Sequence, residues 1–164
     1  MIVEMSRPQR VDSMPPAGLT IDISAAPGEC AAIAARLGVP ALRSLTARFR
    51  LHPLAGGVIA VDGSFSARLV RVCVVSLEEF EMTQRESFTL RFVPEGTESP
   101  DPDPESEDEI PYAGGVIDLG EAAVEQVALD LDPYPRKDGA KMPGEATDAA
   151  ESPFAALLRL RKDG

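Results

Sequence analysis

The chain has 164 residues, of which 44% are hydrophobic and 26% charged, and its formal net charge is −11. This length fits one domain with its own core, and no apolar run approaches the roughly 20 residues of a membrane span. The start lacks an apolar stretch of signal-peptide length, and two cysteines cannot build a disulfide framework, so we expect a cytoplasmic protein.

The first half of the chain alternates between strand and helix patterns. We expect residues 1–16 to be an N-terminal extension and residues 17–135 to be a single domain. Period-two alternation predicts a strand over 19–24 and another over 44–51, with a turn at 52–57. Between them, apolar residues at helical spacing predict a helix from Pro27 to Leu37, with Gly38 as its left-handed cap.

The apolar run from 58 to 75 is too long for one straight strand. Its buried parity changes near residues 69–71, which predicts a bulge or bend there, and Asp62-Gly63 is a second weak point. A further strand is expected over 80–93. These elements predict an α+β fold: a bent antiparallel β-meander of about four to six strands packed with two main helices plus a short C-terminal helix.

Most of the acidity lies in one short segment. Residues 94–109, "PEGTESPDPDPESEDE", carry eight acids and no base, whereas residues 1–93 carry ten Arg against nine Asp or Glu. Four prolines and so many like charges cannot bury enough apolar surface, so we expect a disordered surface loop. The averaged field of the molecule repels nucleic acid.

A second helix is expected over 118–131. Asp118 suits the N-cap, Glu121 suits the third position of a capping box, and Pro133 follows the end. Residues 136–151 have the composition of a linker. Residues 152–164 predict a short terminal helix with an apolar stripe of Phe154, Leu157 and Leu158.

Groups that could carry catalysis are scarce. The one histidine, His52, falls in a predicted turn, and Cys30 and Cys73 lie in apolar runs typical of core thiols. Glu121 and Glu125 could present two carboxylates to a metal, although helix capping and solvation explain them more simply. We therefore expect no catalytic residue, metal, cofactor or small-molecule substrate.

Arginines cluster on the polar faces of the predicted strands. Pairing with glutamates of the neighbouring strands, Glu79, Glu81 and Glu86, is the favoured interpretation. The alternative is a surface that contacts RNA phosphates. The arginines considered for such a contact are Arg48, Arg50, Arg68 and Arg71.

Three stretches in a fixed order carry a family resemblance. They are "VRVCVVSLEEF", "VIDLGEAAVEQVALDLDPYPR" and "SPFAALLRLRK". Together they resemble the YceD-like family of bacterial large ribosomal RNA subunit accumulation proteins, in its alphaproteobacterial form. Many members have a C-x-x-C-L pattern, in which Cys73 matches the first cysteine, Ser76 replaces the second and Leu77 follows. Metal or redox chemistry of paired cysteines is therefore not carried over.

The resemblance implies a role in the synthesis, processing or stability of 23S rRNA, and so in building the large ribosomal subunit. We expect a non-enzymatic factor that acts through protein contacts with a basic ribosomal protein or a processing factor. Its partner-binding residues would include the acidic loop and a set on the two C-terminal helices. That set is Asp118, Glu121, Glu125, Gln126, Phe154, Leu157 and Leu158.

Two alternatives use other chemistry. In the first, the arginine face binds the 23S rRNA precursor directly, and the acidic loop shields that face when RNA is absent. In the second, Glu121, Glu125 and loop acids hold a divalent ion for a metal-dependent RNA-processing enzyme. Such a site needs preorganised ligands, which a proline-rich acidic loop does not favour.

Overall fold

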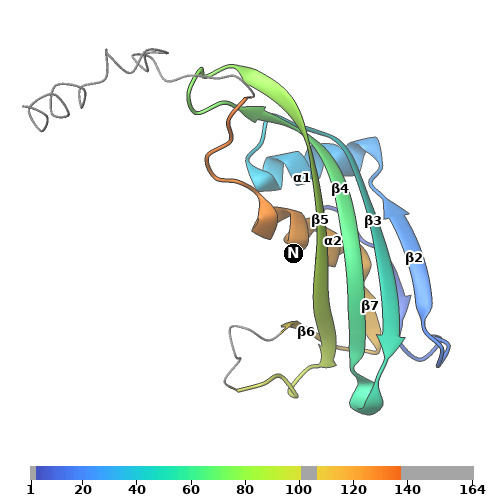
Figure 1. Ribbon diagram of the computed structural model, residues 1–164. Coiled ribbons are helices and arrows are strands. Elements are labelled where there is room, and N and C mark those ends of the chain that lie inside the picture. Colours follow the sequence, from blue (N-terminus) through green and yellow to red (C-terminus); the bar gives the residue numbers. More distant parts are fainter. Residues whose placement is uncertain (1–2, 101–106, 138–164) are drawn as a thin grey trace, which may run out of the picture.

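Three long strands form the centre of the computed structural model, which describes residues 3–100 and 107–137. They are β3 (Ala41–Pro53), β4 (Ile59–Val72) and β5 (Glu79–Pro94). With β2 (Leu19–Ser24) and β6 (Asp108–Tyr112) they make a sheet in the order β2-β3-β4-β5-β6 (Figure 1). The first four strands pair antiparallel as the predicted meander, and the α+β class is confirmed.

The predicted bulge near residues 69–71 is not in β4. All residues of β4 pair in unbroken register with β5, and Asp62-Gly63 continues the strand. The register shift lies in β3, between Leu42 and Ser44. Val70 is buried on the second face of the sheet, whereas Val72 is 40% exposed. The switch of apolar residues from odd to even positions therefore reflects apolar side chains on the face of the sheet away from the helices. It does not mark an extra residue inserted in β4.

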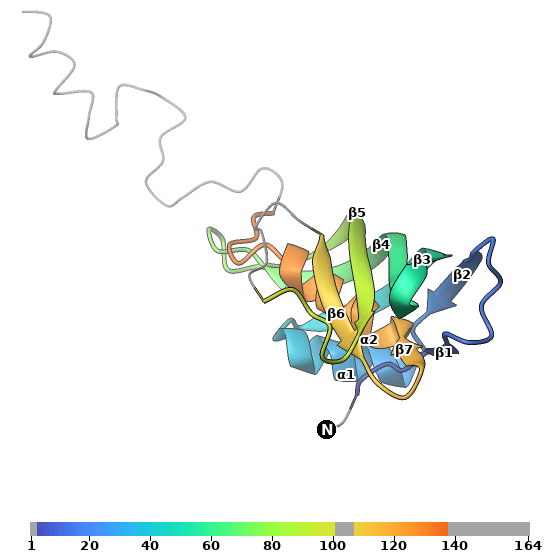
Figure 2. The same ribbon diagram turned by 90° about the horizontal axis from the view of Figure 1, so that it is seen from below.

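Two helices cover one face of the sheet (Figures 1 and 2). They are α1 (Pro27–Leu37), which ends at the left-handed Gly38 as predicted, and α2 (Leu119–Asp130). A short 3-10 turn, η1 (Ala55–Gly57), joins β3 to β4. The core between helices and sheet is mainly aliphatic and contains three buried phenylalanine rings, Phe49, Phe65 and Phe92. Its most buried members include Phe49, Phe92, Leu45, Leu51, Leu69, Leu90, Ile33 and Val124. Removing this apolar surface from water is the main stabilising term of the fold.

The sheet departs from the expected meander at β6, which pairs parallel to β5. Leu90 faces Asp108 and Pro94 faces Tyr112, so the chain must return along β5 before it pairs again. Parallel neighbours need a long crossover connection, and the acidic segment supplies it. The ends of the segment 94–109, expected to be a disordered loop, are ordered: Glu95 donates to Tyr112, Ser99 donates to Glu109, and β6 begins at Asp108. Residues 101–106 lie outside the described residues.

Residues 5–10 belong to the folded domain, which corrects the expected extension over 1–16. Met5 is 1% exposed within the core. Strand β1 (Pro8–Arg10) pairs with β7 (Val116–Asp118) in a separate two-stranded sheet. The Leu119 amide donates to the Arg7 carbonyl, so this segment crosses the start of α2. The expected linker 136–151 and terminal helix 152–164 lie almost wholly outside the described residues.

The start of α1 is held by a carboxylate with two functions. Glu29 accepts from the backbone amide of the N-cap residue Ala26 and forms a two-pronged ion pair with Arg7 at 2.7 and 2.9 Å. Arg7 also donates to the Ser24 carbonyl. The ion pair with Arg7, reinforced by the Ala26 amide, lowers the pKa of Glu29 to about 2. The N-terminal segment is thereby joined to both α1 and β2.

Replacing Glu29 by glutamine keeps the acceptor for Ala26 and removes the charge. A lowered pKa in the folded state stabilises above the unfolded value of 4.5, and this contribution disappears as the pH falls toward 2. We expect Glu29→Gln to lower the free energy of unfolding by about 1 kcal/mol at pH 7. Urea denaturation at several pH values should show this difference shrinking between about pH 5 and pH 3. A constant difference would contradict the assignment.

Candidate protein-binding surface

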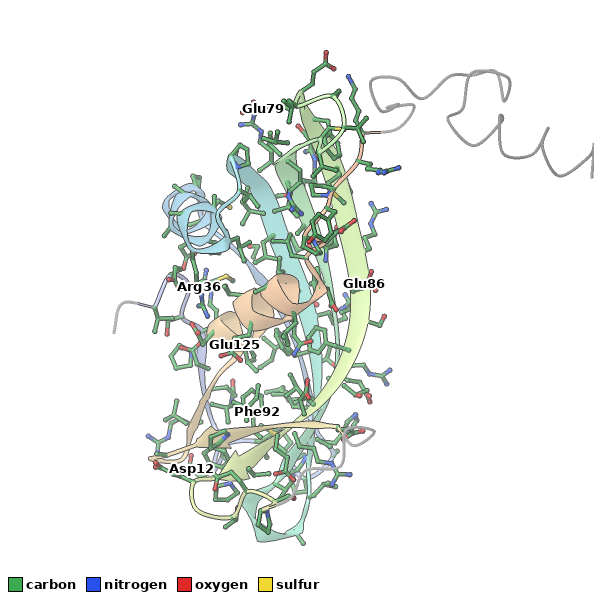
Figure 3. All side chains as sticks on the ribbon, turned by 90° about the vertical axis from the view of Figure 1, so that its left-hand side faces the viewer. Asp12, Arg36, Glu79, Glu86, Phe92 and Glu125 are labelled. Atoms are coloured by element: carbon green, nitrogen blue, oxygen red, sulfur yellow. The ribbon has the colours of Figure 1, made fainter. Side chains whose placement is uncertain are left out.

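A hollow of about 280 Å³ lies between α2 and the β6–β7 region. Apolar side chains form most of its wall, and three acidic residues of β7 and α2 also line it. The apolar wall includes Phe92, Ile110, Pro111, Tyr112, Val116 and Ile117. The acidic residues are Asp118, Glu121 and Glu125. Figure 3 shows Glu125 on the side of α2 that faces Phe92. The hollow combines an apolar lining with negative charge.

The three carboxylates differ in how they are already bound. Asp118 is the N-cap of α2, as predicted: it accepts from the amides of Gly120 and Glu121, and also from Ser6 and the Arg7 amide. Glu121 forms an ion pair with Arg36 at 2.9 Å through one oxygen. Its other oxygen is buried and has no partner among the described residues.

Glu125 is the carboxylate that remains available in this hollow. Within residues 3–100 and 107–137 it has no hydrogen bond or ion pair to a side chain or amide. Burial, with a smaller contribution from the charge of Glu121, raises the pKa of Glu125, while Arg36 opposes the shift. This carboxylate is partly removed from water and has no bonded partner among the described residues, a condition that favours a cationic ligand.

Two other predicted partner-binding residues, Asp118 and Gln126, have structural roles in the described part of the chain. Gln126 is 7% exposed because α2 is buried on most of its circumference, so it is not available to a partner. Asp118 is occupied by the cap and the N-terminal segment. Phe154, Leu157 and Leu158 lie outside the described residues.

The acidic segment reaches the same end of the molecule. The Glu95 amide donates to the carbonyl of Tyr112, which lines the hollow, and β6 begins at Asp108. Glu109 accepts from the amide and hydroxyl of Ser99, both at 2.9 Å, which closes the base of the loop. The two acidic features predicted separately therefore meet beside one hollow, a juxtaposition that sequence spacing cannot reveal.

The second face of the sheet is open and rich in hydroxyl groups and arginines. A shallow hollow of about 910 Å³ crosses four strands, between Asp22 and Arg85. Three of the predicted RNA-contact arginines lie on this face. Arg48 pairs with Asp22 at 2.7 Å and Arg68 pairs with Glu81, whereas Arg50 has no ion pair among the described residues. Cross-strand pairing thus neutralises two of these arginines. Of the three glutamates expected as partners, Glu81 forms such a pair, whereas Glu79 and Glu86 form none among the described residues.

Arg71 does not share that face. It is 8% exposed, and its guanidinium donates to the Asp132 carbonyl at 2.7 Å. Buried Gln84 donates in the same way to the Asp130 carbonyl. Gln84 thus binds the carbonyl of the last residue of α2, which has no partner within the helix, and Arg71 binds a carbonyl just beyond the helix end. Arg71 is therefore buried and does not lie with the other three arginines on the open face.

Cys73 ties the β4–β5 turn to the end of the described chain. Its sulfur accepts from the amides of Ser76 and Lys137, both at 3.4 Å. The Ser76 hydroxyl, followed by these amides, lowers the pKa of Cys73 to about 6 although the side chain is buried. Ser76 thus forms hydrogen bonds within the β4–β5 turn, at the position where many members of the resembling family have a second cysteine.

Two further properties can be stated for the described part of the chain. No three His, Cys, Asp or Glu side chains there gather as a metal site would require. The metal-holding set proposed for the enzyme alternative is not assembled there, because Glu121 is paired with Arg36. None of the described helices has the length and apolar character needed to cross a bilayer.

These observations define a class: a small α+β protein with a one-sided core, whose described surface carries shallow hollows rather than a deep charged cleft. Residues 61–161, more than half of the chain, match the family described as Large ribosomal RNA subunit accumulation protein YceD, and the chain belongs to this family. The resemblance found in the sequence is confirmed. No curated protein and no solved structure matches the chain. Membership connects it with accumulation of the large-subunit ribosomal RNA.

Proposed function

We propose that this protein supports 23S rRNA accumulation in the cytoplasm by binding a basic protein, either a ribosomal protein of the assembling large subunit or an rRNA-processing factor. The binding surface is the end of the molecule where α2, β6 and the acidic segment meet. Binding and release there need no covalent chemistry. The protein acts as an assembly factor and not as an enzyme.

One observation carries this proposal: the acidic segment is hydrogen-bonded to a residue that lines the hollow of Glu125. Glu95 is bonded to Tyr112, and Tyr112 and Glu125 line the same hollow. Concentrated negative charge raises the encounter rate with a cationic partner, and adjoining apolar surface adds short-range affinity. A basic protein that folds against rRNA carries the complementary charge.

Direct binding of the rRNA precursor by the open sheet face is the second candidate. The hydroxyl-lined hollow beside Arg48 and Arg85, and the absence of an ion pair for Arg50 among the described residues, favour it. Against it, Asp22 and Glu81 neutralise Arg48 and Arg68. A phosphate would have to displace these carboxylates, so the protein-binding candidate is preferred.

The test compares two triple variants with equal net charge. One is Glu95→Gln, Asp108→Asn and Glu125→Gln, at the proposed surface. We expect it to bind purified large-subunit ribosomal proteins about tenfold more weakly at low salt, with a flatter salt dependence. When it replaces the natural copy in cells, 23S rRNA should fall relative to 16S rRNA.

The matched control neutralises exposed acids elsewhere: Glu79→Gln, Glu86→Gln and Asp130→Asn. None of the three side chains has a bonded partner among the described residues. The control should retain binding within about threefold, because net charge changes equally while the local field does not. Equal losses of binding in both variants would mean that the overall charge of the protein, and not this surface, determines binding. Undiminished binding of naked 23S rRNA by both variants, without binding of the proteins, would favour the open sheet face.

A further inference from the structure

The hollow between α2 and β6 has the features of a side-chain pocket. Its wall is apolar on the side of β6, where Ile110 and Tyr112 stand against Phe92. Its other side is α2, where Glu121 and Glu125 lie one helical turn apart. Residues four apart on a helix present neighbouring side chains, so both carboxylates border the same space.

The acceptors in this pocket exceed the donors that the described residues supply. Arg36 serves one oxygen of Glu121 and one of Glu4, both at 2.9 Å. Among the described residues, the second oxygen of Glu121 is buried without a partner, and the partly buried Glu125 side chain has no hydrogen bond or ion pair. A buried acceptor without a donor costs free energy and calls for an explanation, such as a water or a ligand that donates there.

An arginine side chain supplies what is missing. Its guanidinium carries five donors in a planar fork and is weakly hydrated, so it can serve two carboxylates at once. Its aliphatic stem can lie along an apolar wall while the charged end meets the acids. A lone metal ion would satisfy the carboxylates and leave the wall uncovered. The existing Arg36–Glu121 pair shows that a guanidinium fits beside this helix.

We propose that this pocket binds one arginine side chain of a basic partner protein. The inference rests on the proposed function and makes it specific, because it assigns the partner an exposed arginine. The flanking acids of the β5–β6 connection attract the partner, and the pocket selects the residue that anchors it. Buried arginine anchors are frequent at the centres of protein interfaces.

The direct test is an NMR titration of the ¹⁵N-labelled full chain with N-acetyl-arginine amide. We expect saturable shift changes at amides around the pocket, including Ala113, Val116 and Glu125. N-acetyl-citrulline amide has nearly the same shape without the charge and should give no saturable change. Glu125→Gln should weaken arginine binding at least about tenfold. Equal responses to both probes, or shifts spread over all acidic surfaces, would overturn the proposal.

A control on the same helix is Asp130→Asn, which removes an equal charge from the exposed end of α2 and should leave the titration unchanged. Thermal unfolding checks that Glu125→Gln stays folded, which we expect because it removes a carboxylate that burial disfavours. If the triple variant loses the basic proteins while Glu125→Gln alone does not, and arginine amide does not bind, this pocket is rejected and the proposed function stands. If arginine amide binds in the pocket but the basic proteins do not bind the chain, the proposed function is rejected instead.

Discussion

Replacing Gly120 by alanine is expected to lower the free energy of unfolding by about 3 kcal/mol, although alanine is the better helix former. A Cβ atom at this position would lie 2.6 Å from the carbonyl oxygen of Met5 and 3.0 Å from the amide nitrogen of Arg7. Both are backbone atoms of the segment that crosses α2. The segment would have to move, and with it the buried Met5 side chain and the bonds of Arg7.

The matched control is Gly28→Ala in α1. Each glycine is the second residue of its helix, but a Cβ at Gly28 would meet nothing within 4 Å. Alanine there should stabilise by about 0.5–1 kcal/mol. Urea denaturation of both variants separates the effects. If Gly120→Ala were as stable as the parent protein, the N-terminal segment would not be packed on α2 as described.

Local signals explain what the sequence predicted correctly. The boundaries of α1 follow from Pro27 and Gly38, and those of α2 follow from Asp118 and the prolines beyond it. These signals act through neighbours in the chain, so one sequence is enough to interpret them. The strand at 19–24 was recognisable for the same reason, because its alternation reflects one buried face.

The errors arise where distant segments meet. Met5 lies in a short stretch with no periodicity, and it is buried because its segment packs across the start of α2, far away in the sequence. The parallel pairing of β6 could not be predicted, because five residues with one proline carry no register signal. Long-range contacts of this kind depend on tertiary structure, which overrides local propensity.

The candidate site shows the same division. Asp118 was correctly predicted as a cap, and that role removes it from the set available to a partner. Gln126 was expected at the surface, but only Glu121 and Glu125 form the polar stripe near the start of α2. The small residues Ala122 and Ala123 were the usable signal, since they allow close packing on both sides of the helix. Residues of β6 form one wall of the hollow, and the position of β6 in the sheet could not be predicted from the sequence.

The second large effect is expected at Gly63, where Gly63→Ala should cost about 2 kcal/mol. Glycine usually weakens a strand, so alanine would ordinarily help. Here Gly63 pairs with Phe49 on one side and Phe88 on the other, and a Cβ would lie 2.2 Å from the Phe88 ring. Phe88 packs edge-to-face on Phe49 with ring centroids 5.7 Å apart. The Phe88 ring fills the space that a side chain at position 63 would occupy.

A double-mutant cycle shows whether Gly63→Ala destabilises because of the Phe88 ring or because β4 does not accept any side chain at this position. Phe88→Leu withdraws the ring, so adding Gly63→Ala to it should cost clearly less than Gly63→Ala costs in the parent. Denaturant midpoints of the four proteins give the coupling. Additive costs would mean that Gly63 is needed for its backbone, as its interpretation as a weak point of the strand implied. Non-additive costs would mean that Gly63 is needed because the Phe88 ring occupies the space beside it.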